Sequence, residues 1–191
     1  MQRPGQTLSI TFATAKRWKL PKSVRQLVMD CCCHAHGTRF ELHAAVVMPD
    51  HVHLLLTPGS DVEGNTFGLS QILNSIKGAS SHAVNRALGR HGPVWQSESF
   101  DHVLRSEESI RGTAEYICAN PVRAGLVGSE DEYSWLGAVG SRVPRWEKVR
   151  DHRALTAADG CATKVGGAID LAPSIRGLSI HDLAKGQRWQ Q

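Results

Sequence analysis

The fold class that this sequence predicts is α+β with an antiparallel sheet, and two observations support it. Segments that alternate polar and apolar residues, as strands do, are interspersed with segments whose apolar residues recur at helical spacing. Two of the strand segments are joined by a tight connection at Pro49 and Asp50, which predicts a hairpin. With 191 residues, 41% of them hydrophobic and 21% charged, the chain can bury a core as one domain.

The first half of the chain predicts three strands and one helix. Residues 7–14 alternate and are rich in β-branched side chains, which favours a half-buried strand. Residues 21–36 begin with a proline, repeat apolar side chains at helical spacing and end before a glycine, which indicates a helix. Residues 39–47 predict a second strand, and a third strand begins at His51.

The second half predicts two further helices. Residues 58–68 are rich in Gly, Asp and Asn and read as a loop, and a helix follows over 70–88. After a break, residues 94–104 read as an extended segment. A helix over 106–120 opens with early acidic residues, and Pro121 is expected to stop it.

We predict two parts in this chain, a catalytic domain over residues 1–140 and a basic C-terminal extension over 141–191. Beyond about residue 140 the periodicity is weak, and between residues 142 and 191 nine Lys or Arg stand against five acids. The net charge of +4 and pI of about 8.9 permit a phosphate-rich partner without requiring one.

Composition also bears on the compartment. The longest apolar run is far short of a membrane span, and the N-terminus lacks the apolar segment of a signal peptide. Five cysteines, three of them adjacent at 31–33, do not form the pattern of a disulfide framework and suit a reducing compartment. A zinc site in the stretch 31–36 is disfavoured, because sequence neighbours on a helix point in different directions. We expect a cytoplasmic protein without a membrane association.

The most informative motif is the pair His51 and His53. Successive side chains of a strand point to opposite faces, so these two share one face while Val52 and Leu54 share the other. Two imidazoles on one face are suited to hold a metal ion. The alternative is a pair of polar residues on the solvated face of a half-buried strand.

A second constellation lies on the helix predicted over 106–120. Tyr116 and Asn120 are four residues apart, so they stack on one helical face and present a hydroxyl and an amide in the same direction. A tyrosine on a helix is more often a half-buried core residue than a nucleophile. The chain has only two tyrosines, however, so the candidates are few.

The sequence resembles the single-tyrosine HUH transposases, and most closely their REP-associated tyrosine transposase branch. The resemblance covers roughly residues 8–136, and its motifs occur in the expected order and spacing. They are Glu41-Leu42-His43-Ala44, Met48-Pro49-Asp50-His51-Val52-His53-Leu54-Leu55, Val94-Trp95-Gln96, Phe100-Asp101-His102-Val103-Leu104, Tyr116-Ile117, Asn120-Pro121-Val122 and Ala124-Gly125-Leu126-Val127.

The resemblance implies a ferredoxin-like antiparallel sheet with helices on one face and with His51 and His53 on a central strand. It implies that these histidines are metal ligands, that Tyr116 is the nucleophile and that Asn120 is the third protein ligand, where wider relatives have glutamine. The implied substrate is single-stranded DNA that carries a hairpin, such as a palindromic repeat. A monomer is favoured over a dimer.

The chemistry of the residues agrees with that resemblance. A phenol has a pKa near 10, so Tyr116 needs a cation beside it or beside the phosphate that it attacks. Mg²⁺ or Mn²⁺ would serve, since two imidazoles and an amide oxygen leave coordination positions open. We therefore predict a metal-dependent endonuclease and strand transferase that forms a 5′-phosphotyrosine. Two alternatives stay open: a hairpin-DNA-binding protein with little turnover, and a nuclease that uses water.

The contacts to DNA are less specific in the sequence. Trp95 is a candidate for stacking on a base, or else a core aromatic residue. Candidates for contact with phosphates, each of which is by itself more often a solvated charge, are Lys77, Arg86, Arg90, Arg105, Arg111 and Arg123.

Overall fold

The computed structural model describes residues 5–105 and 109–138. The predicted extension over 141–191, the expected boundary near residue 140 and the expected helix start at residues 106–108 lie outside the described residues.

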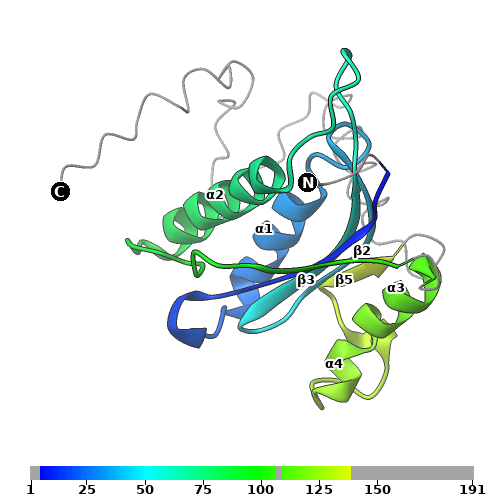
Figure 1. Ribbon diagram of the computed structural model, residues 1–191. Coiled ribbons are helices and arrows are strands. Elements are labelled where there is room, and N and C mark those ends of the chain that lie inside the picture. Colours follow the sequence, from blue (N-terminus) through cyan, green and yellow to red (C-terminus); the bar gives the residue numbers. More distant parts are fainter. Residues whose placement is uncertain (1–4, 106–108, 139–191) are drawn as a thin grey trace, which may run out of the picture. The chain divides into compact units, whose positions relative to one another are not determined.

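Five antiparallel strands form one sheet in the described part of the chain (Figure 1). They are β1 (Leu8–Ala13), β2 (Phe40–Val47), β3 (His51–Pro58), β4 (Phe100–Val103) and β5 (Leu136–Ala138). Their order across the sheet is β4-β1-β3-β2-β5, so that β3 is central. The predicted α+β class and the central position of the histidine strand are confirmed.

Within residues 5–105 and 109–138, four α-helices and two short 3-10 helices accompany the strands. They are η1 (Ala15–Arg17), α1 (Lys22–Cys33), α2 (Leu69–Leu88), α3 (Ile110–Cys118), α4 (Asn120–Arg123) and η2 (Glu130–Glu132). No helix of the described residues is long and apolar enough to cross a membrane.

The sheet buries both of its faces, each against different helices (Figure 1). On one face, α1 and α2 cover a large apolar core with members such as Leu8, Ile10, Phe12, Val24, Val28, Leu54, Leu56, Ile72 and Ile76. On the other face, α3 packs on β2, β3 and β5 through a smaller core that includes Ala44, Val46, Leu55, Ala114, Ile117 and Leu136. The expectation that the helices lie on one face is therefore wrong for α3, because its apolar stripe needs a second sheet surface.

Three local features differ from the sequence prediction. The strand β5 was not expected, because Leu136–Ala138 is too short to show a periodicity. The extended segment 94–104 contributes only Phe100–Val103 to the sheet. Pro121 does not end the helical region: α3 ends at Cys118, and Pro121 lies in the first turn of α4, where its missing N–H is tolerated.

Candidate functional site

His51 and His53 lie on the face of β3 that α3 covers, as the alternation of strand side chains predicts. Both imidazoles are half-buried. Their ring centroids are 4.7 Å apart and the ring planes are nearly perpendicular, at 89°. The two rings are therefore close enough to act on one bound ion.

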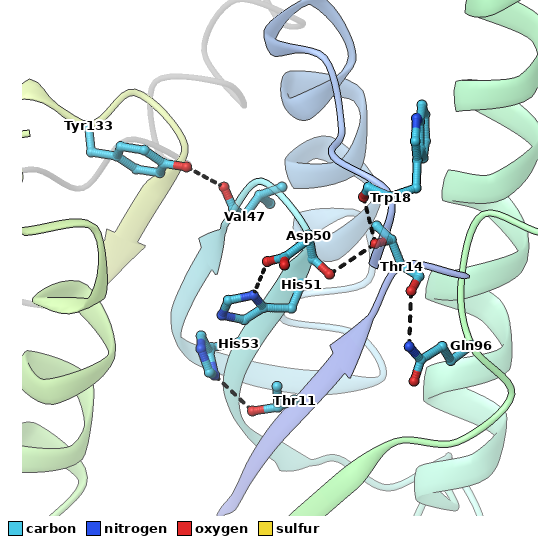
Figure 2. Close-up of polar contacts among 9 residues, drawn as sticks. All are labelled: Thr11, Thr14, Trp18, Val47, Asp50, His51, His53, Gln96 and Tyr133. Atoms are coloured by element: carbon cyan, nitrogen blue, oxygen red, sulfur yellow. Dashed lines mark hydrogen bonds and ion pairs between the residues drawn. The ribbon is translucent and has the colours of Figure 1, made fainter. Parts of the chain in front are cut away.

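Each imidazole is held through its Nδ1 atom (Figure 2). His51 Nδ1 lies 2.7 Å from a carboxylate oxygen of Asp50, and His53 Nδ1 lies 2.7 Å from the hydroxyl of Thr11. Thr11 is the residue of β1 that pairs with His53 across the sheet. Metal-binding histidines are commonly oriented by such a bond on the second ring nitrogen, which leaves Nε2 as the ligand atom.

The electrostatics favour a neutral His53. Burial, together with a smaller contribution from the neighbouring His51, lowers the pKa of His53 to about 4. At neutral pH the imidazole therefore carries no charge and needs to lose no proton before it binds a metal.

Asp50 remains ionised beside His51. Burial by itself would raise the pKa of the Asp50 carboxyl, but the hydrogen bond from His51 and the nearby charges of Arg17 and Lys19 lower it below its usual value. An ionised Asp50 accepts a hydrogen bond from Nδ1–H of His51 and so favours the tautomer in which Nε2 carries a lone pair.

Thr14, which follows β1, is hydrogen-bonded to the hairpin that carries the histidines. The hydroxyl of this buried residue lies 2.6 Å from the carbonyl oxygen of Trp18 and 3.1 Å from that of Asp50. Its own carbonyl accepts a hydrogen bond of 3.1 Å from the side chain of Gln96 (Figure 2). Asp50 is thus held at two points: its backbone carbonyl bonds to Thr14, and its carboxylate contacts His51.

Tyr116 lies on α3 and is 59% exposed. Ser109 caps the start of the helix, because its hydroxyl accepts a hydrogen bond from the backbone N–H of Gly112. Its buried side chains face the sheet, and Tyr116 lies away from them with the guanidinium of Arg123 4.3 Å from its ring centroid. The phenol is accessible to a substrate, as a nucleophile must be.

Asn120 uses its amide nitrogen within the helical region. Nδ2 donates to the carbonyl oxygen of Ile117 at 2.9 Å and to that of Tyr116 at 3.3 Å. The Ile117 carbonyl would otherwise lack a helical donor, because Pro121 has no N–H. With Nδ2 engaged, Oδ1 is the atom of Asn120 that could bind a ligand.

The structure places Tyr116 and Asn120 on the helices over the histidine face, but it joins neither to a histidine by a hydrogen bond or ring contact in the described residues. No group of three or more His, Cys, Asp or Glu in the described ranges is placed to hold a metal. The pair His51 and His53 would therefore need ligands of another kind, such as an amide oxygen, a substrate oxygen or water.

The residues that the sequence suggested as DNA contacts lie in different environments in the structure. Trp95 is wrong as a base-stacking residue, because it is 6% exposed, packs edge-on against Phe12 and donates to Ser80 in the core. The ammonium of Lys77 donates to the carbonyl oxygens of Ser97 and Glu98 and so holds that loop.

The candidate arginines also differ in what their side chains contact. Arg111 pairs with Glu115 on the exposed side of α3, and Arg123 covers Tyr116. Arg86 and Arg90 line a pocket at the end of α2.

Sequence reasoning missed the residues that orient the two histidines. Asp50 was interpreted only as a turn residue, although its place next to His51 was a usable signal. Thr11 and Thr14 carry no signal of their own, since their contacts depend on how β1 pairs with β3.

Comparison with known proteins supports the same fold and relationship. A family model described as "Transposase IS200 like" matches residues 8–120. A REP-associated tyrosine transposase of Escherichia coli K12 is 32% identical over 89 residues, which are 46% of this chain and 48% of that protein. A relative from Haemophilus influenzae Rd is 26% identical over 93 residues, 46% of this chain and 53% of its own. The chain spans about half the length of these curated relatives.

One solved structure has a matching architecture. The structure of a REP-associated tyrosine transposase bound to a REP hairpin superposes with a TM-score of 0.54 at 20% identity, and covers 94% of this chain and 96% of that one. This likeness shows that the two proteins share a fold. Because the family model spans more than half of the residues, the chain belongs to the IS200-like transposase family.

Proposed function

We propose that this protein is a metal-dependent endonuclease and strand transferase for hairpin-bearing single-stranded DNA, with Tyr116 as its nucleophile. The observation that carries the proposal is the pair His51 and His53, which share one face of β3 with each Nδ1 already engaged. Membership of a transposase family and the exposed phenol of Tyr116 support it.

His51 and His53 would hold the divalent ion through Nε2, and Asn120 would contribute Oδ1 as the third protein ligand. The donor set fits Mg²⁺ or Mn²⁺, because it combines imidazole and amide groups and leaves positions for oxygen atoms of the substrate. A bound divalent ion supplies Lewis-acid polarisation of a non-bridging phosphate oxygen.

The proposed reaction is a transesterification. The Tyr116 oxygen forms a bond to phosphorus while the bond from phosphorus to the 3′ oxygen breaks, which yields a 5′-phosphotyrosine and a free 3′ hydroxyl. The phenol gives up one proton to solvent and the leaving 3′ oxygen takes up one. The phosphodiester bond is exchanged, not hydrolysed, so that the strand can be rejoined without a nucleotide cofactor.

Hairpin DNA is proposed as substrate because a related protein was solved with a REP hairpin. The exposed position of Tyr116 on α3 suits an unpaired strand, which can bend to reach the phenol as a stacked duplex cannot.

The test is incubation of the protein and a labelled single-stranded hairpin oligonucleotide with Mg²⁺ or Mn²⁺, resolved on a denaturing gel. The proposal predicts a slow-migrating covalent product that disappears in Tyr116→Phe and with a chelator. Tyr133→Phe is the matched control, because Tyr133 is the other tyrosine and is buried with its hydroxyl donating to the Val47 carbonyl (Figure 2). It should still form the product.

Other outcomes would contradict the proposal in recognisable ways. Cleavage without the covalent product would indicate a nuclease that uses water. Tight binding of intact DNA by wild type and Tyr116→Phe alike would indicate a hairpin-binding protein.

A further inference from the structure

A group of cations lies beside the histidine site, on the turn that follows β1. Lys16 and Arg17 are exposed and have backbone φ angles of 53° and 55°. This left-handed conformation is unfavourable for residues with a Cβ atom, and it persists where the surrounding structure imposes it. Strain of this kind is concentrated at functional sites.

The turn is fastened to the hairpin of the histidines at both of its ends. Before the turn, the backbone N–H of Thr14 donates to the carbonyl of Asp50 at 2.9 Å. After it, the N–H of Leu20 donates to the carbonyl of Pro49 at 2.6 Å. The exposed cations Lys16, Arg17 and Lys19 are therefore carried next to the connection from which His51 emerges.

A second turn, at the end of α2, extends this positive charge. The helix ends at Gly89, whose φ of 59° is the left-handed conformation that glycine adopts freely. The Arg90 guanidinium that follows lies 4.0 Å from the ring centroid of Trp18, and the carbonyl of Val94 accepts a hydrogen bond from Ala15. The two turns are thus in contact.

The second turn also contains a pocket with a volume of about 370 Å³. Its lining includes two arginines and two histidines and no acidic residue: His82, Asn85, Arg86, Gly89, Arg90, His91 and Gly92.

Two polar atoms of this lining are not used by the protein. Asn85 Oδ1 and Arg90 Nη1 are buried and have no hydrogen-bond partner among the residues that the structure describes. Buried polar groups without partners are rare in folded proteins, and a functional role or a bound water or ion is among the explanations for them. Nη1 requires an acceptor, such as a phosphate oxygen, and Oδ1 requires a donor, such as the amino group of a base.

We propose that a basic surface formed by Lys16, Arg17, Lys19, Arg86 and Arg90 binds the sugar–phosphate backbone of the DNA that flanks the cleaved bond. Nucleic acid fits better than a single small anion, because the cations are spread over two turns and none forms a salt bridge to a carboxylate within the described residues. The inference rests on the proposed function, since it concerns the substrate of that site.

The experiment is fluorescence anisotropy of a labelled hairpin oligonucleotide with single-stranded flanks, titrated with the full-length protein over a series of salt concentrations. The first variant is Lys16→Gly with Arg17→Gly, which removes two charges at positions where glycine is sterically preferred. Its melting temperature should stay within a few degrees of wild type. The second variant is Arg86→Gln on the exposed surface of α2.

Loss of phosphate contacts lowers the slope of log Kd against log salt by about 0.7 to 0.9 for each contact. We expect a decrease of about 1.4 to 1.8 for the double glycine variant, with binding about tenfold weaker at moderate salt. Arg86→Gln should lower the slope by about half as much. Arg39→Gln is the control, because it removes one charge just before β2, at the end of the β2–β3 ladder away from His51.

The outcomes separate this inference from the proposed function. If wild type binds the hairpin and both variants keep its slope, the basic surface is wrong while DNA binding stands. If Arg39→Gln lowers the slope as much as Arg86→Gln, binding depends on overall charge and the inference is also overturned. If wild type does not bind the hairpin at all, the proposed function fails together with it.

Discussion

The two faces of β3 share one backbone but have different compositions and different partners. Val52, Leu54 and Leu56 are 0% exposed and pack under α1 and α2. On the opposite face, which we call the polar face, His51 and His53 are half-buried and make hydrogen bonds to side chains. The apolar face accounts for most of the burial that holds the sheet, so polar groups on the other face can be used for chemistry.

The polar face is also ordered by bonds between strands. Beyond His53, the hydroxyl of Thr57 lies 2.8 Å from His43 Nε2 and 2.8 Å from the hydroxyl of Thr7. Burial holds the pKa of His43 below its usual value, although nearby Glu41 opposes this. Such cross-strand bonds fix rotamers, so the imidazoles are presented in one arrangement before a ligand arrives.

The largest expected effect comes from breaking the apolar face. Leu54→Ala should lower the free energy of unfolding by about 2 to 5 kcal/mol, because it opens a cavity in the core. His53→Ala should cost about 1 kcal/mol, mainly from the lost hydrogen bond with Thr11. Urea denaturation measures both, and equal losses would show that the two faces contribute alike to stability.

A pH titration of stability sharpens the comparison. The pKa of His53 is about 4 in the folded protein and about 6.5 in the unfolded chain, so between these values only the unfolded chain binds the proton. Stability should rise with pH through this window and level off above it, with a contribution of up to about 3 kcal/mol.

The measurement is denaturation of the metal-free protein from pH 4 to 7.5, with His53→Gln as the reference. His43 also has a lowered pKa and acts in the same pH range, whereas the lowered pKa of Asp50 changes stability only below the usual range of a carboxyl, so the difference between the two proteins isolates His53. Parallel curves for the two proteins would contradict the prediction.

Removal of the orienting partners tests whether the polar face is built for a ligand. Asp50→Asn and Thr11→Val should each weaken Mn²⁺ binding by about 10- to 100-fold, since the Nδ1 partners hold the imidazoles in place. Thr57→Val lies on the same face but contacts His43, so it should leave the affinity unchanged. Calorimetry would refute the idea if all three variants bound equally.

The smallest effect concerns Asn120. Asn120→Ala leaves the Ile117 carbonyl without its side-chain donor and should cost about 1 kcal/mol of stability. If Asn120 also binds the metal, Asn120→Asp should retain more Mn²⁺ affinity than Asn120→Ala, because a carboxylate oxygen replaces the amide oxygen. Equal affinity of both variants would restrict Asn120 to its place in the helix.

Most of the framework was predictable because it depends on local patterns. The two-residue period placed His51 and His53 together, and helical spacing located α1 and α2 to within a few residues. The contacts of Thr11 and Trp95 were not predictable, because they depend on strand register and on a helix fifteen residues away in sequence.

The placement of α3 was the other feature beyond sequence patterns. An apolar stripe on a helix does not specify which face of a sheet it will cover. The position of Tyr116 relative to the histidine face therefore depended on the tertiary structure.

The most direct test of the account is Mn²⁺ binding by wild type, His51→Gln and His53→Gln, measured by isothermal titration calorimetry with melting temperatures recorded in parallel. If the polar face of β3 is a metal site, wild type will bind one ion and each variant will bind at least about tenfold more weakly at nearly unchanged melting temperature. Wild-type affinity in both variants, or no binding by wild type, would contradict the account.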